Sequence, residues 1–161
     1  MLLYFLRHGD ASRDSSIDDN ERPLTNLGTQ QATLAAAFLQ RIDPDIGAVL
    51  SSPLARARQT ASIVRGKNTL PAPITSEYLL NGSDQRQLFK QLESLGVQSA
   101  LLVGHEPHLS ETISLLLCGN REAGIEMKKC GIALVETPVT IEAGCGRLRW
   151  LVSPDTIQHL A

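Results

Sequence analysis

Two arginines and two histidines stand at positions from which they could bind a tetrahedral oxyanion. Arg7 and His8 directly follow one short apolar run. Arg56 lies a few residues beyond a second such run, and His105 lies just beyond a third. Guanidinium groups bind phosphoryl oxygens through forked hydrogen bonds that lysine cannot reproduce, and cations gathered at one place repel one another unless an anion joins them. These residues therefore predict a local site for a phosphoryl group.

His8 is the member of this set that suits nucleophilic attack on phosphorus. Neutral imidazole offers a lone pair at neutral pH without prior deprotonation. Gly9 follows it and has no Cβ to crowd an incoming phosphate. We expect the Nδ1–H group of His8 to donate to a backbone carbonyl, which leaves Nε2 free to attack. This chemistry requires no metal ion and no organic cofactor.

Three charged residues near these positions have less specific interpretations. Arg22 either contacts the substrate or pairs with an acidic residue at position 18, 19 or 21, and the sequence leaves both open. Asp10 is interpreted as a supporting carboxylate that holds Arg7 or Arg56 in place. Arg58 is expected on the solvated face of a helix.

His108 follows His105 by three residues, and this spacing can indicate a metal site. The remaining ligands of a zinc site are not evident, so a structural role or a place at the rim is predicted, with no metal. His159 is expected at the surface of the tail.

The chain has three cysteines, which lack C-x-x-C spacing and are predicted to be reduced, buried thiols: Cys118, Cys130 and Cys145.

Short apolar runs and helical periodicities predict the elements that position these side chains. The expected strands are residues 2–6, 48–50, 74–76, 100–103, 132–137 and 147–152. The expected helices run from a cap at Thr25 or Asn26 to Asp43, from Pro53 to about Arg65, from a cap at Ser83 to Gly96, and through Leu109 to Leu117. The polar segment 10–21 is expected to be an exposed loop.

The alternation of strands and helices predicts an α/β fold. We expect a three-layer αβα sandwich with a mainly parallel central sheet and an antiparallel edge near the C-terminus. Residues 1–161 are expected to form a single domain. Ligands of such folds bind beyond the carboxyl ends of the strands, where Arg7, His8 and His105 fall.

Charge and hydropathy exclude several classes of partner. The 161 residues carry a formal net charge of −2, so no global positive field favours nucleic acid or an anionic membrane. The apolar opening at residues 1–6 is too short for a signal peptide, and no apolar run reaches the roughly 18 residues of a membrane span. The chain is expected to be cytoplasmic and a monomer or weak oligomer.

Four ordered blocks give a specific resemblance: LRHGD at residues 6–10, RPLTNLG at 22–28, SSPLARARQTA at 51–61 and VGHEP at 103–107. Together they resemble the histidine phosphatase, or phosphoglycerate mutase-like, superfamily, and are most similar to its SixA-type phosphohistidine phosphatases. The resemblance extends from residue 2 to about residue 117. It implies that His8 becomes phosphorylated and that Arg7, Arg56 and His105 bind the phosphate.

The chain departs from larger members of that superfamily in the proton donor. Those members usually supply a carboxylic acid from the segment corresponding to SEYLLNGSD, which has no clear counterpart here. Glu106 is one substitute, and Glu77 and Asp84 are weaker ones. Because imidazole, with a conjugate-acid pKa of roughly 6.5, leaves more easily than an alkoxide, the hypothesis is that the substrate is phosphohistidine on a protein, with inorganic phosphate as product.

Two other functions remain open at this point. One is a phosphatase for a small phosphate ester, which would need a proton donor such as Glu106. The other is a non-catalytic module that binds phosphate or a phosphoprotein.

Overall fold

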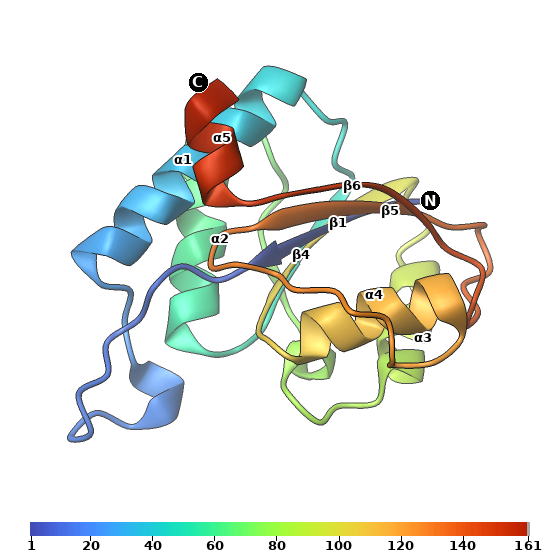
Figure 1. Ribbon diagram of the computed structural model, residues 1–161, viewed down its shortest axis with the longest axis horizontal. Helices are drawn as coiled ribbons and strands as arrows, with labels where there is room; N and C mark the ends of the chain where they lie inside the picture. The colour runs from blue at the N-terminus through green and yellow to red at the C-terminus, as the bar shows by residue number, and fades with distance from the viewer. Residues whose placement is uncertain (161) are drawn as a thin grey trace.

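Six strands form one mixed sheet that carries the rest of the chain (Figure 1). The computed structural model describes residues 1–160. The strand order is β3-β2-β4-β1-β5-β6. The strands are β1 (Leu2–Arg7), β2 (Ala48–Ser51), β3 (Ile74–Thr75), β4 (Ser99–Gly104), β5 (Ile132–Glu136) and β6 (Arg147–Val152). The first four are mutually parallel, whereas β5 and β6 are antiparallel to their neighbours, which confirms the predicted antiparallel edge.

The apolar run of β1 is buried because helices cover both faces of the sheet. Successive side chains of a strand point to opposite faces. Leu3 and Phe5 accordingly pack in one hydrophobic cluster, and Tyr4 and Leu6 pack in the other. Removing such a continuous apolar run from water is the main stabilising contribution to the sheet.

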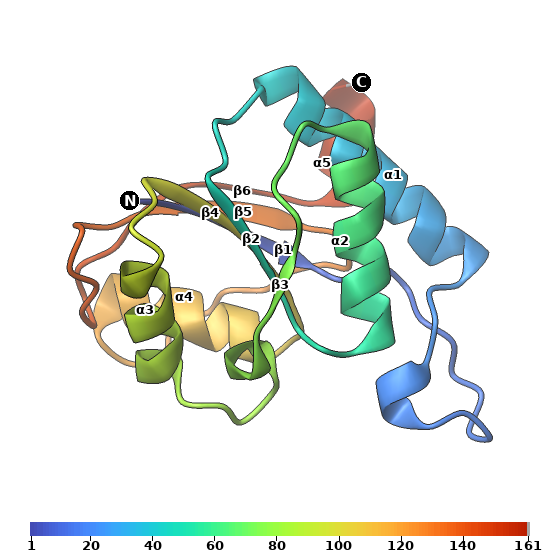
Figure 2. The same cartoon turned by 180° about the vertical axis from the view of Figure 1, so that it is seen from behind.

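The helices divide between the two faces (Figures 1 and 2). On one face lie α1 (Asn26–Ile42), α2 (Ala55–Lys67) and the short α5 (Pro154–Leu160). On the other lie α3 (Gln85–Ser94) and α4 (His108–Cys118). The chain is therefore the expected three-layer αβα sandwich. No helix within residues 1–160 is both long enough and apolar enough to cross a bilayer.

Helix ends follow local capping chemistry, with two corrections to the sequence-based boundaries. The Thr25 side chain accepts a hydrogen bond from the Gly28 amide and begins α1, as predicted, and Asp43 ends it in the left-handed conformation. The cap of α3 is Asp84 rather than Ser83, because the Asp84 carboxylate accepts from the Arg86 amide. Pro53 lies before α2 rather than in its first turn, since the cap residue is Leu54.

The sequence did not predict three short helical elements, one of which is the 3-10 turn η2 (Glu77–Leu79). A 3-10 turn, η1 (Asp19–Glu21), interrupts the exposed loop that follows β1, and α5 follows β6. The loop returns to the start of α1 beside an isolated bridge between Ala11 and Leu24. It thereby brings η1 to the edge where the parallel strands end.

Candidate active site

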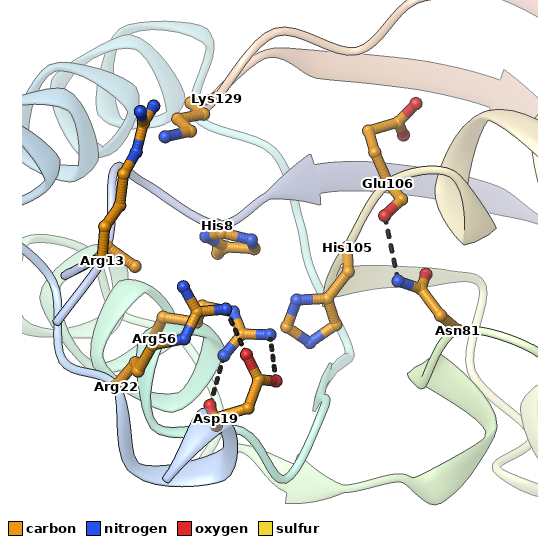
Figure 3. Close-up of a pocket in the computed structure, with 10 residues that line it drawn as sticks. His8, Arg13, Asp19, Arg22, Arg56, Asn81, His105, Glu106 and Lys129 are labelled. Carbon is orange, nitrogen blue, oxygen red and sulfur yellow. Dashed lines mark hydrogen bonds and ion pairs between the residues drawn. The ribbon is translucent and has the colours of Figure 1, made fainter. Parts of the chain in front are cut away.

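A cavity of about 360 Å³ opens beyond the carboxyl ends of β1, β2 and β4 (Figure 3). The residues that line it are His8, Ala11, Arg13, Asp19, Arg22, Arg56, Asn81, His105, Glu106 and Lys129. Strand ends, the start of α2 and the loop after β1 all contribute. Of the six residues predicted for the site, five line this cavity, and Arg7 is the exception.

His8 leaves the end of β1 as a buried, neutral imidazole. Its backbone amide continues the parallel ladder by donating to the Gly104 carbonyl at 3.0 Å. Nδ1 lies 2.6 Å from the Gly9 carbonyl oxygen. Because a carbonyl oxygen only accepts, Nδ1 carries the proton and Nε2 keeps its lone pair, as the sequence predicted. Burial, reinforced by the charges of Arg56, Arg7 and Lys129, lowers the pKa of His8 to about 4, despite the opposing bond to Gly9.

Two glycines allow the turn after His8 to press against the start of α1. A Cβ on Gly9 would lie 2.6 Å from the Gly28 carbonyl oxygen, and a Cβ on Gly28 would lie 2.0 Å from the Asp10 carbonyl oxygen. Side chains therefore fit at neither position. The Thr60 hydroxyl also accepts a hydrogen bond from the Gly9 amide. These contacts fix the backbone that carries the imidazole.

His105 faces His8 across the cavity, with ring centroids 4.9 Å apart. Nε2 of His105 shares a 2.7 Å hydrogen bond with the Ser52 hydroxyl, at the end of β2. Nδ1 is buried and has no hydrogen-bond partner within residues 1–160. Burial, followed by the charges of His8 and Arg56, lowers the pKa of His105 to about 3. A bound oxyanion beside the ring would favour its protonated form.

Arg56 enters the cavity from the first turn of α2 and is nearly buried. Its Nη1 donates to the Asp19 backbone carbonyl at 2.6 Å, and its Nη2 donates to Asp19 Oδ2 at 3.1 Å. Arg22 donates to the other carboxylate oxygen of Asp19 and to the Ser12 carbonyl. Both interpretations of Arg22 thus have support, because it pairs with an acidic loop residue and also lines the cavity.

Arg7 lies behind the cavity rather than on its lining. Its Nη1 donates to the Met127 carbonyl at 2.7 Å, whereas its Nε is buried without a hydrogen-bond partner in the described residues. Its charge is close enough to contribute to the lowered pKa of His8. A direct contact between Arg7 and phosphate stays a prediction.

Asp10 does not hold Arg7 or Arg56, so that interpretation is wrong. Its carboxylate instead pairs with Lys129 and accepts a 2.7 Å hydrogen bond from the Thr25 hydroxyl. These two hydrogen bonds hold the pKa of Asp10 below its usual value. The fold brings Lys129 to this end of the sheet because residue 129 lies just before β5, which pairs with β1.

Besides Ala11, sequence reasoning missed four polar residues that line the cavity: Arg13, Asp19, Asn81 and Lys129. It named Asp19 only as one possible partner of Arg22. Each lies in a polar loop whose pattern indicates exposure and nothing more. Only the position of Arg13 in the loop directly after the Arg-His pair could have drawn attention to it.

The candidate proton donors differ in their access to the cavity. Glu106 lines it, but Oε1 accepts from the Ser110 amide at the start of α4, and Figure 3 shows the carboxylate turned away from His105. Asp84 caps α3, and Glu77 lies in the short 3-10 turn η2 (Glu77–Leu79). Neither Asp84 nor Glu77 lines the cavity.

His108 is fully buried at the start of α4, which agrees with a structural role. Burial lowers its pKa. Within residues 1–160, no cluster of three or more His, Cys, Asp or Glu side chains is arranged to hold a metal ion.

The three cysteines differ in burial. Cys130 is buried as expected, and burial raises its pKa to about 12. Cys118 is exposed and Cys145 is half-buried, so the prediction of buried thiols is wrong for those two.

Comparisons with known proteins identify relatives over most of the chain. The sequence profile of the histidine phosphatase superfamily (branch 1) matches residues 3–81. Phosphohistidine phosphatase SixA of Escherichia coli is 33% identical over 159 residues, covering 96% of this chain and 94% of that protein. An uncharacterized protein of Picosynechococcus is 33% identical over 153 residues, covering 92% and 89%. A solved structure of the protein histidine phosphatase SixA complexed with tungstate superposes with a TM-score of 0.87 at 31% identity, covering 96% and 98%.

Proposed function

This chain belongs to the histidine phosphatase superfamily, and from that premise we propose that it removes phosphate from phosphohistidine on a protein, with His8 as the nucleophile. The observation that carries the proposal is the hydrogen bond between Nδ1 of His8 and the Gly9 carbonyl. It leaves Nε2 as the unprotonated nitrogen, in a cavity that also presents Arg56 and His105.

The reaction proceeds in two steps. Nε2 of His8 attacks phosphorus in line, and the bond from phosphorus to the substrate nitrogen breaks as imidazole departs. Water then attacks the phosphorus on His8 and releases inorganic phosphate. Arg56 and His105 bind the phosphoryl oxygens, with Arg7 and Arg22 adding positive charge, because stabilising the developing charge is the main catalytic contribution in phosphoryl transfer.

The leaving group supports a phosphohistidine substrate. A phosphate ester needs an acid to protonate a departing alkoxide. Glu106 is the acid nearest to that role, and its carboxylate is bound to the Ser110 amide. Imidazole departs with less assistance, since its conjugate acid has a pKa of roughly 6.5. The relatives named phosphohistidine phosphatase support the same substrate. We place the protein in the cytoplasm, where it acts on a phosphohistidine-containing protein.

Trapping of the phosphoenzyme tests the role of His8. Brief incubation with a ³²P-labelled phosphohistidine protein, followed by an alkaline quench, should leave acid-labile label on the wild type and on His159→Ala. His159 is exposed on α5, outside the cavity, so its variant controls for loss of a histidine. His8→Ala should carry no label. Label retained on His8→Ala would identify another nucleophile. No label on the wild type, together with tight phosphate binding, would identify a pure binding module.

A substrate panel separates the phosphohistidine phosphatase from the ester phosphatase. We expect kcat/KM for a phosphohistidine protein to exceed that for phosphoserine and for sugar phosphates by at least tenfold. A tenfold preference for the esters would exclude the proposed substrate. In that case Glu106→Gln should slow the esters strongly, because they need the acid.

A further inference from the structure

Asp19 and Glu106 are the two carboxylate residues on the cavity lining, and they are oriented differently. Glu106 is held at the start of α4 by the Ser110 amide. Asp19 instead lies beside Arg56 and Arg22, as Figure 3 shows. It comes from η1, in a loop that reaches the site only through the fold.

The Asp19 carboxylate is ionised and has unused acceptor capacity. Burial works to raise its pKa, but hydrogen bonds from Arg22 and Arg56 outweigh that effect and hold the pKa below its usual value. An ionised carboxylate accepts about four hydrogen bonds, and side chains occupy two of these positions here. The side chain remains 61% exposed, so the other positions are open.

The carboxylate and a bound phosphoryl group would share one guanidinium. Asp19 Oδ2 lies 3.1 Å from Nη2 of Arg56. A phosphoryl oxygen bound to the same guanidinium would lie about 2.8 Å from its nitrogen. Such sharing would hold the phosphoryl group beside Asp19.

The rest of the cavity disfavours a cationic substrate ring. Arg13, Arg22, Arg56 and Lys129 all contribute positive charge to its lining. A phosphohistidine ring departs as neutral imidazole only if its second nitrogen is already protonated, and the ring is then a cation. Like charges repel, so such a substrate needs a carboxylate beside the ring.

We propose that Asp19 accepts a hydrogen bond from the second ring nitrogen of the substrate's phosphoimidazole and thereby selects phosphohistidine over phosphate esters. This inference rests on the proposed function. The substrate N–H stays bound to Asp19 while the phosphorus–nitrogen bond breaks. Its electron pair returns to the ring, which departs as neutral imidazole, and phosphorus becomes bonded to Nε2 of His8. Phosphate thus passes between two imidazoles whose other N–H groups are each bound to an oxygen, that of Asp19 and that of the Gly9 carbonyl.

The test compares two small substrates in the wild type, Asp19→Asn and Glu21→Gln. One substrate is 1-phosphoimidazole, which offers the ring N–H when protonated, and the other is p-nitrophenyl phosphate, which offers none. Glu21 lies in the same 3-10 turn and faces Arg58, outside the cavity, so its variant controls for the lost negative charge.

We expect Asp19→Asn to lower the ratio of kcat/KM for 1-phosphoimidazole to that for p-nitrophenyl phosphate by tenfold or more, as fits the loss of a hydrogen bond between ionised partners. Glu21→Gln should leave the ratio within twofold of wild type. Equal losses on both substrates would make Asp19 only a support for Arg56 and overturn the inference, as would an unchanged or higher ratio. Phosphorylation of His8 by p-nitrophenyl phosphate in all three proteins tests the nucleophile separately. No phosphate on His8 of the wild type would refute the proposed function, whereas phosphorylated His8 with an unchanged ratio would refute only the role of Asp19.

Discussion

The two histidines of the cavity predict a loss of stability in mild acid. Burial lowers the pKa of His8 to about 4 and that of His105 to about 3. Both rings have a pKa of about 6.5 in the unfolded chain. Below that pH the unfolded chain binds protons that the folded chain does not, so the free energy of unfolding decreases as the pH falls. The stabilising contribution is complete above about pH 6.5 and is lost as the pH falls toward the folded pKa values.

The size of the effect follows from these shifts. Between about pH 7 and about pH 5, each ring lowers the free energy of unfolding by about 1.8 kcal/mol, so the pair lowers it by about 4 kcal/mol. Asp10 and Asp19, whose pKa values lie below their usual range, stay ionised across this interval and contribute little. Since whole domains are stable by only about 5–15 kcal/mol, the change is large.

Urea unfolding followed by circular dichroism at pH 7, 6 and 5 measures this change. The wild type and His159→Ala should lose similar amounts, because His159 is exposed. His8→Asn should lose about 1.8 kcal/mol less than the wild type, since the ring of His8 is gone, whereas buried His105 and His108, whose pKa values are also lowered by burial, titrate in both proteins. Wild-type stability that changes by less than about 1 kcal/mol over this range would refute the reasoning, as would an NMR titration placing His8 near its ordinary pKa of about 6.5.

Three substitutions test the supports of the site. Gly28→Ala places a Cβ 2.0 Å from the Asp10 carbonyl oxygen, so we expect a loss of about 1–3 kcal/mol in thermal unfolding and at least tenfold lower turnover; normal turnover would contradict the tight packing. Ser52→Ala removes the Nε2 partner of His105 and should lower kcat/KM about tenfold, whereas an effect under twofold would mean that the bond does not orient the ring. Arg56→Lys cannot reproduce the forked contact, so kcat should fall about 100-fold, with vanadate titration giving weaker binding; unchanged vanadate affinity would place the anion elsewhere.

Local sequence determined the elements and the residues at their junctions. The continuous apolar run of β1 is long enough for a buried strand and too short for a helix, which fixed where Arg7 and His8 emerge. The orientation of His8 was also predictable, because its acceptor is the carbonyl of the next residue, Gly9. Helix ends were less certain, since Ser83 and Asp84 are both good caps and only the formed helix selects between them.

The tertiary structure alone decided which charges meet in and beside the cavity. Asp19 and Arg56 are separated by 37 positions, and Asp10 and Lys129 by 119. These residues lie in polar segments, where no periodicity constrains a side chain and a charged residue indicates only exposure. Their pairing depends on how the loop after β1 folds over the start of α2, and on β5 pairing with β1 so that residue 129 reaches the carboxyl ends of the parallel strands. The four motifs thus specify where phosphate chemistry takes place, while long-range packing sets the electrostatic environment in which His8 acts.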